Sequence, residues 1–205
     1  MKRILTSMMV FLILIGLTGT VGASIISITG LNDWTSIKFD YNGYHYNNNE
    51  WAGEFLLTID GKTASGYCID LDHTTYVPSG PYSTTLRDLD SNQRWELQAA
   101  WLMNKYGGRT AIENAALQVA IWDLEYASFT YTGGGQVGKY LTSYLDDVYN
   151  NFPTGYSGSG YQIANLAPAA QNLLVKIPAP VPEPTTLLLI GSGLLGLAAF
   201  RRKAK

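Results

Sequence analysis

The stretch TAIENAALQVAIWDLEY, residues 110–126, decides the fold, because it predicts a helix with almost no polar side. Thr110 and Glu113 have the spacing of a capping box, which predicts the start of this helix. Over residues 115–122 every side of the helix is apolar except at Gln118. A helix that is apolar all round is buried. We therefore expect the rest of the domain to pack around it.

The chain before this helix is typical of β-strands. Two dipeptides, Asn42-Gly43 and Asp60-Gly61, are the strongest sequence signals for two-residue hairpin turns. We expect strands within residues 24–76. The strands that flank the two turns are expected at residues 35–41, 54–59 and 63–71.

Further helices are expected on both sides of residues 110–126. Asp90 and Gln93 have the spacing of an N-cap and its partner, so a helix should start near Ser91 and stop at Gly107-Gly108. A third helix and a last strand are expected at residues 141–149 and 171–177. Segments rich in Gly, Pro, Ser, Thr and Tyr predict loops at residues 78–83, 127–138 and 151–168. The predicted fold class is α+β, with a β-rich N-terminal part, two or three helices and a returning strand.

The charge of the central region limits its partners. Residues 24–180 hold eight Lys or Arg and fifteen Asp or Glu, a formal charge of −7. Such a region has no basic surface to meet phosphates, so we expect no nucleic-acid partner. Its many tyrosines are typical of strands, and aromatic side chains can also stack on sugars.

The N-terminus has the three parts of a signal peptide. Lys2 and Arg3 precede an apolar run over residues 8–17, and Val21-Gly22-Ala23 offers the small residues that a signal peptidase accepts. An N-terminal membrane anchor is the alternative, but the apolar run is short for one. We expect a signal peptide over residues 1–23, with cleavage after Ala23.

The C-terminus, VPEPTTLLLIGSGLLGLAAFRRK over residues 181–203, combines an apolar segment with a basic end. The apolar residues 185–200 are slightly fewer than the ~17–25 that span a bilayer comfortably. The basic tail, residues 201–205, would stay cytoplasmic by the positive-inside rule. A plain membrane anchor is one interpretation.

This terminus also resembles the PEP-CTERM sorting signal. The resemblance rests on Pro182-Glu183-Pro184 at the end of a spacer over residues 178–184, on the short hydrophobic helix, and on Arg201 and Arg202. It implies recognition by an exosortase-type sorting protease, which removes a transient membrane anchor. It further implies delivery to the surface or extracellular matrix of a Gram-negative bacterium, often with exopolysaccharide.

Cys68 and Gln118 are the residues most open to a chemical role. Cys68 is the only cysteine, and an unpaired cysteine in an exported protein indicates intermolecular pairing or a reactive thiol. The alternative is a small buried hydrophobe. A buried amide without partners costs about 1–3 kcal/mol, so Gln118 needs either a hydrogen-bond partner in the core or a task.

The sequences around these two residues resemble the thioester domain of Gram-positive surface adhesins. That family joins a cysteine in a Tyr-Cys-hydrophobic motif to a glutamine in a Thr-Gln-x-Ala-hydrophobic-Trp motif. This chain has Tyr67-Cys68-Ile69 and Leu117-Gln118-Val119-Ala120-Ile121-Trp122, with Leu117 in place of the usual threonine.

The resemblance implies a thioester-like surface domain over residues 24–177, with a crosslink between Cys68 and Gln118. The bond would form without a cofactor and would capture an amine or hydroxyl of a surface or matrix partner. Because each molecule would react once, we expect no turnover enzyme.

Other sites are less specific. Asp70, Asp72 and His73 could hold a metal ion, but so few ligands favour a solvated strand end, and we expect no metal site. A Cys68–His73 hydrolase dyad would need residues five apart on one strand, which lie on opposite faces. A non-covalent polysaccharide- or matrix-binding module with a buried, unreactive Cys68 remains the main alternative.

Overall fold

The structure, a computed structural model, describes residues 23–177. Nearly all of the predicted signal peptide, and the whole sorting signal from residue 178 onward, lie outside the described residues. Between residues 23 and 177, no helix is both long enough and apolar enough to cross a membrane.

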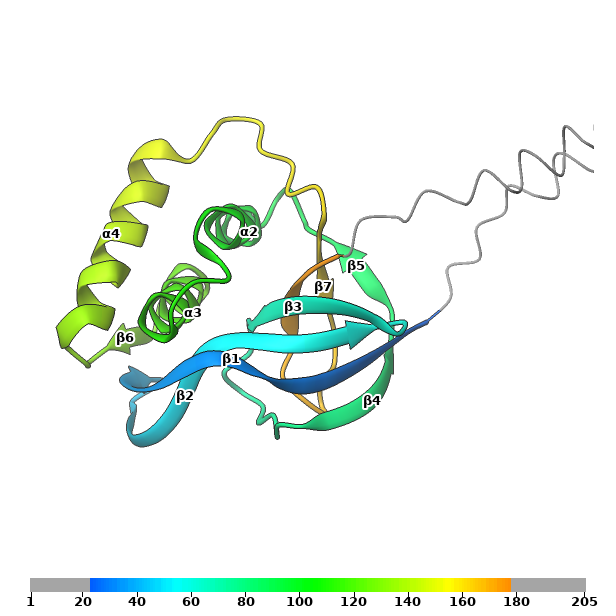
Figure 1. Cartoon of the computed structure of the whole chain (residues 1–205). Coiled ribbons are helices and arrows are strands. Elements are labelled where there is room, and N and C mark those ends of the chain that lie inside the picture. The colour runs from blue at the N-terminus through cyan, green and yellow to red at the C-terminus, as the bar shows by residue number, and fades with distance from the viewer. Residues whose placement is uncertain (1–22, 178–205) are drawn as a thin grey trace, which may run out of the picture.

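One antiparallel sheet of eight strands forms half of the domain, and three helices gather on one side of it (Figure 1). Seven of the strands have the order β4-β1-β2-β3-β8-β7-β5. The eighth strand, β6, pairs only with β1 and is not part of this order. The strands are β1 (Ser24–Tyr41), β2 (Tyr44–Ile59), β3 (Lys62–Cys68), β4 (Ser79–Thr84), β5 (Leu86–Asp88), β6 (Phe129–Tyr131), β7 (Tyr161–Ala164) and β8 (Leu173–Lys176). The helices are α2 (Arg94–Tyr106), α3 (Ala111–Glu125) and α4 (Gly135–Asn151). The predicted α+β class is confirmed, with strands first and helices between them and the returning strands.

Both predicted hairpin turns are present. Asn42 and Gly43 connect β1 to β2 with φ of 49° and 80°, and Asp60 and Gly61 connect β2 to β3 with φ of 51° and 76°. A turn in which both central residues have positive φ follows the right-handed twist of the strands. These turns pair Tyr41 with Tyr44 and Ile59 with Lys62.

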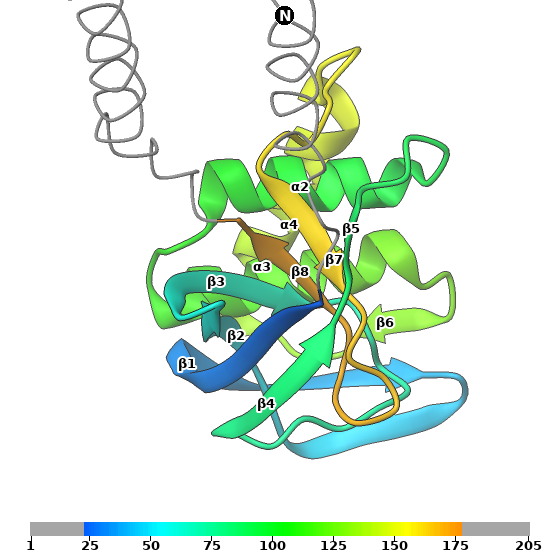
Figure 2. The ribbon, with the colours of Figure 1, turned by 90° about the vertical axis from the view of Figure 1, so that its right-hand side faces the viewer.

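Helix α3 lies at the centre of the domain, as its apolar sequence predicts. It contacts β1, β2, β3, α2 and α4 (Figure 2), and every residue from Asn114 to Trp122 is buried. The capping box is also present. Thr110 Oγ1 accepts a hydrogen bond from the Glu113 N–H, and the Glu113 carboxylate accepts one from the Thr110 N–H.

Thr110→Ala is expected to lower the free energy of unfolding by about 1 kcal/mol, because an N-cap hydroxyl is lost. Urea unfolding followed by circular dichroism measures this change. Thr142→Ala is the matched control, since the Thr142 hydroxyl bonds only to Gly138 O within α4, and alanine favours a helix interior. Equal stability of the two variants would contradict a stabilising cap.

The predicted start of the first helix near Ser91 is wrong. Helix α2 begins at Arg94, because Asp90 forms a turn in which its carboxylate accepts a hydrogen bond from the Asn92 N–H at 2.9 Å. The Asp90 N–H donates at 2.7 Å to the carboxylate of Glu96, which also pairs with Arg87. The start of α2 is therefore stabilised by the carboxylate of Glu96 in its first turn, and not by the expected pair of Asp90 and Gln93.

Three segments predicted as loops contain short strands. These strands are β4, β6 and β7. Both β4 and β6 pair with β1, which is distant in the sequence, and β7 pairs with β8, the next strand along the chain. Such short strands form because a neighbouring edge is available, which local composition does not show.

Candidate functional site

Cys68 is the last residue of β3, where only one of the two neighbouring strands still pairs with it. Strand β2 pairs with β3 only as far as Gly66, whereas β8 continues alongside Cys68. The next residue, Ile69, donates its N–H to Asn172 O on the β8 side at 3.0 Å. Because backbone groups alternate along a strand, the N–H and C=O of Cys68 point to the other side, where β2 no longer supplies partners.

Gln118 of helix α3 fills that gap. Its Oε1 accepts a hydrogen bond from the Cys68 N–H at 2.9 Å, and its Nε2 donates to the Cys68 O at 2.7 Å. Gln118 is 1% exposed and Cys68 2%. The structure therefore brings the two residues together, with the side-chain amide acting as a short substitute for a β-strand.

The sulfur of Cys68 lies beside the backbone of Asp70. Sγ donates to Asp70 O at 3.1 Å, and the Asp70 N–H donates to Sγ at 3.2 Å. Burial raises the pKa of the Cys68 thiol far above its ordinary value, while the Asp70 backbone and the Trp122 indole oppose that rise. The thiol is thus neutral at rest, and any thiolate that forms meets N–H donors.

Helix α3 presents three polar groups along one face toward this strand end. Gln118, Trp122 and Glu125 are spaced by four and three residues, which aligns them on a helix. Trp122 is only 4% exposed, and its indole N–H lies near the Cys68 thiol but outside hydrogen-bond geometry with any described residue. The buried Oε2 of Glu125 likewise has no such partner. An unpaired buried polar group costs about 1–3 kcal/mol, so both groups call for an explanation.

Burial first, and then the neighbouring carboxylates of Asp70, Glu96 and Asp72, raise the pKa of Glu125 to about 8. The Tyr126 hydroxyl opposes this rise. Sequence reasoning missed Glu125, although its position seven residues after Gln118 was a usable signal.

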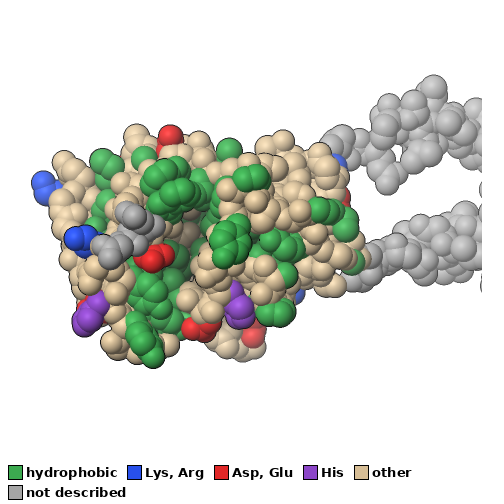
Figure 3. Space-filling view, turned by 90° about the horizontal axis from the view of Figure 1, so that it is seen from below, with side chains coloured by type: hydrophobic (Ala, Val, Ile, Leu, Met, Phe, Trp, Pro, Cys, Tyr) green, Lys and Arg blue, Asp and Glu red, His purple; other side chains and the backbone are tan. Residues whose placement is uncertain are grey.

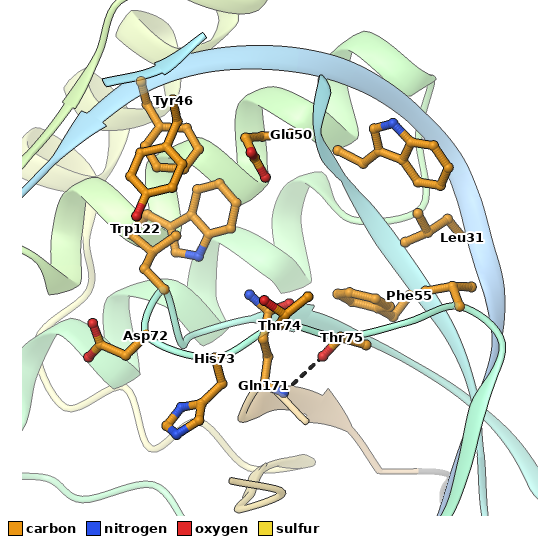
Figure 4. A pocket seen from close by; sticks show the side chains of 14 residues that line it. Leu31, Tyr46, Glu50, Phe55, Asp72, His73, Thr74, Thr75, Trp122 and Gln171 are labelled. Carbon is orange, nitrogen blue, oxygen red and sulfur yellow. Dashed lines mark hydrogen bonds between the residues drawn. The ribbon is translucent and has the colours of Figure 1, made fainter. Parts of the chain in front are cut away.

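A cavity of about 360 Å³ opens next to this face of α3. Figure 3 shows hydrophobic side chains gathered around a hollow on that side of the molecule. The walls are aromatic, with Phe39, Tyr46, Trp51, Phe55 and Trp122. In Figure 4 the Trp122 indole and the Glu50 carboxylate point into the space, and His73 and Asp72 lie at its edge.

Gln171 connects the cavity to the Cys68 sulfur, and sequence reasoning missed it. The side chain lines the cavity, and its Nε2 donates at 2.7 Å to Asp70 O, the oxygen that accepts the Cys68 thiol. Its backbone N–H donates to Thr75 Oγ1 at 2.8 Å (Figure 4). Gln171 follows no periodic pattern, so only the fold reveals it.

The carboxylate of Asp70 organises the turn after β3. It accepts hydrogen bonds from the backbone N–H groups of Asp72 and His73, and from the His73 ring at 2.8 Å. The sulfur of Cys68 meets the Asp70 backbone, while the His73 ring meets the Asp70 carboxylate. Among residues 23–177, no three His, Cys, Asp or Glu side chains are arranged to hold a metal ion.

Comparison with known proteins bears on the C-terminus. Residues 180–203 match the model of the PEP-CTERM protein-sorting motif. The chain therefore carries a sorting signal of exported surface proteins of Gram-negative bacteria, which an exosortase-type protease processes. No curated protein sequence matches the chain.

Among solved structures, the domain is similar to the thioester domain of the Staphylococcus aureus TIE protein. The TM-score is 0.40 and the sequence identity 12%, over 78% of this chain and 81% of that chain. A similarity of this size carries no argument about function, which must come from the site itself.

Proposed function

We propose that this exported surface protein forms an internal thioester between Cys68 and Gln118 and uses it to capture a nucleophile covalently. The observation that supports the proposal is the pair of hydrogen bonds between the Gln118 amide and the backbone of Cys68. These bonds hold the amide carbon beside the residue that carries the thiol. Well-oriented groups of this kind react with effective concentrations of roughly 10⁵–10⁸ M.

The bond would form by acyl transfer within the chain. The Cys68 thiolate attacks Cδ of Gln118, and negative charge develops on Oε1, which already accepts the Cys68 N–H. The C–N bond then breaks, and the nitrogen leaves as ammonia with the proton that the thiol has lost. No cofactor enters the reaction, and the buried position limits hydrolysis of the product.

Capture would be a second acyl transfer at the same carbon, with the Cys68 sulfur as the leaving group. An amine or hydroxyl of a surface or matrix partner attacks the thioester carbonyl, the C–S bond breaks, and Cys68 regains a proton. The partner becomes joined to the former Gln118 side chain. Each capture consumes one thioester and leaves the partner attached, so the protein acts as a single-use adhesive and is not a turnover enzyme.

The alternative function is non-covalent binding of a polysaccharide or matrix component, with Cys68 and Gln118 as core residues. Trp34 and Trp51 favour it, because they stack with ring centroids 4.2 Å apart and are 42% and 53% exposed. Trp51 also lines the cavity. Large aromatic rings left in water beside a cavity are typical of a binding surface.

Intact mass separates the two functions. Wild-type protein purified without amines should be lighter than its processed sequence by one ammonia, and Cys68 should resist alkylation. Methylamine should then add to Gln118 and release an alkylatable thiol. Cys68→Ser is the control, because it keeps the backbone groups that hold Gln118 and should show the full mass. Full mass with a freely alkylatable Cys68 in the wild type would refute the thioester.

A further inference from the structure

We propose that the hydroxyls of Tyr67 and Tyr126 position the thioester reaction, because they join the two ends of α3 to the end of β3 and so keep Gln118 opposite Cys68. This role rests on the proposed function for its chemical step, in which the Cys68 thiolate attacks Cδ of Gln118 and ammonia leaves. The alignment of α3 with β3 stands on hydrogen bonds that the proposed function does not use.

The first of these hydrogen bonds lies near the start of α3 and one residue before Cys68 on the strand. The Tyr67 hydroxyl donates to Oδ1 of Asn114 at 3.0 Å, and both side chains are fully buried. Asn114 is itself held in place, because its Oδ1 also accepts the Arg109 N–H at 3.1 Å and its Nδ2 donates to the Arg109 O at 3.0 Å. Tyr67 is therefore bound to a fixed point in the first turn of the helix.

The second contact lies at the other end of α3 and one residue after Cys68. Tyr126 is the C-cap of the helix, and its hydroxyl donates to the Ile69 O at 3.1 Å and accepts the Leu71 N–H at 3.4 Å. Its ring packs edge-on against Tyr41, with centroids 5.1 Å apart. A phenylalanine can keep this packing and lose only the two hydrogen bonds.

The α3 residues that bind the strand end form one row on the helix surface. Gln118 follows Asn114 by four residues, Tyr126 follows Gln118 by eight, and side chains at multiples of four residues line up as a ridge. This ridge meets three successive residues of the strand end in chain order, namely Tyr67, Cys68 and Ile69. Gln118 makes the middle contact, so its amide cannot shift along the strand without stretching a hydrogen bond on one side of it.

The alignment matters for the rate of bond formation. The buried residues of α3 next to Gln118 are apolar, and hydrophobic burial is non-directional, so packing alone leaves the helix freer to shift along its axis. A misplacement of about 1 Å between reacting groups can slow a reaction by roughly a hundredfold. The hydrogen bonds on both sides of Cys68 therefore bear on the reaction and not only on stability.

Refolding experiments measure this rate. The full chain is dissolved at its full mass in urea with a reductant and diluted into amine-free buffer with a mild detergent, and the loss of ammonia is followed by intact mass. Tyr67→Phe and Tyr126→Phe should each slow the loss roughly tenfold under conditions in which circular dichroism shows every variant fully folded. A purely structural role changes the folded fraction and leaves this rate unchanged. Tyr161→Phe is the matched control, because the buried Tyr161 hydroxyl joins a different strand, β7, to Asn104 of α2 at 3.3 Å.

The outcomes separate the positioning role from the thioester itself. If both test variants lose ammonia as fast as the wild type and Tyr161→Phe, the two hydroxyls do not position the reaction, and the thioester stands. If the wild type keeps its full mass, the thioester is refuted, and the role in the reaction is refuted with it.

Hydrogen exchange tests the alignment without the covalent bond. In a Cys68→Ser background no thioester forms, and the backbone N–H at position 68 can still donate to Gln118. Tyr67→Phe and Tyr126→Phe should each speed the exchange of this N–H by roughly fivefold relative to the Ile121 N–H, which reports opening of α3 as a whole. Tyr161→Phe should leave the ratio unchanged. An unchanged ratio in both test variants would show that the tyrosine hydroxyls do not hold Gln118 on Cys68.

Discussion

Gln118→Ala is expected to lower the free energy of unfolding by about 3–5 kcal/mol, one of the two largest effects in this domain. The substitution leaves the N–H and C=O of Cys68 unpaired in the core, and each orphaned group costs about 1–3 kcal/mol. It also leaves a void between the buried helix α3 and the end of β3. Urea unfolding of both proteins measures the difference.

Cys68→Ala isolates the hydrogen-bond contribution from any covalent one. Both variants abolish a thioester, but Cys68→Ala keeps the backbone groups and the Gln118 amide that binds them. The stability gap between the two variants therefore reports the amide alone. If Gln118→Ala and Cys68→Ala unfold at the same urea concentration, the hydrogen bonds of the Gln118 amide do not stabilise the fold measurably. The same logic makes Cys68 variants the better probe of the chemistry, since they leave the fold least disturbed.

The sequence predicted the centre of the fold because its signals there are local. The capping box at Thr110, the apolar surface of α3 and the turns at Asn42-Gly43 and Asp60-Gly61 each depend on residues a few positions apart. The short strands β4 and β7 could not be predicted in the same way. Strands β4 and β7 are short and form against distant partners, so their composition resembles that of loops.

At the candidate site, too, the sequence predicted the residues but not the contacts between them. The motifs around Cys68 and Gln118 singled out both residues, but nothing in them indicated that the amide would bind the cysteine backbone. That arrangement depends on where β2 stops pairing with β3, which is a property of the sheet register. Gln171 reaches the site from the segment before β8, roughly a hundred residues after Cys68, and only the folded chain brings it there.

The central position of the site implies a constraint on how a partner reaches it. Cys68 and Gln118 are both buried, yet Trp122 and Gln171 line the open cavity and contact the same strand end. In the proposed function, a partner would therefore meet the side chains that line the cavity before it meets the buried Cys68 and Gln118.

Glu125→Gln is expected to make the domain more stable at alkaline pH, by on the order of 2 kcal/mol at pH 9. The folded-state pKa of Glu125 is raised from 4.5 to about 8, chiefly by burial and then by Asp70, Glu96 and Asp72. Between these two values the folded protein holds a proton that the unfolded chain has released. Wild-type stability should therefore fall as the pH rises through this window and level off above it, as far as Glu125 is concerned. The full shift would correspond to almost 5 kcal/mol, and partial exposure to solvent reduces it.

Urea unfolding at pH 4.5, 7 and 9 measures this dependence. Wild type and Glu125→Gln should differ little at pH 4.5, where the folded carboxyl is protonated and the unfolded one is only half ionised, and should diverge as the pH rises. Glu113→Gln, at the other end of α3, is the matched control. The pKa of Glu113 is lowered by its hydrogen bond to Thr110, so this variant should lose stability at neutral pH and keep the alkaline decline. A Glu125→Gln protein that declines as steeply as wild type would show that Glu125 is ionised in the folded state, and its unpaired oxygen would then require a cation or donor from outside the described residues.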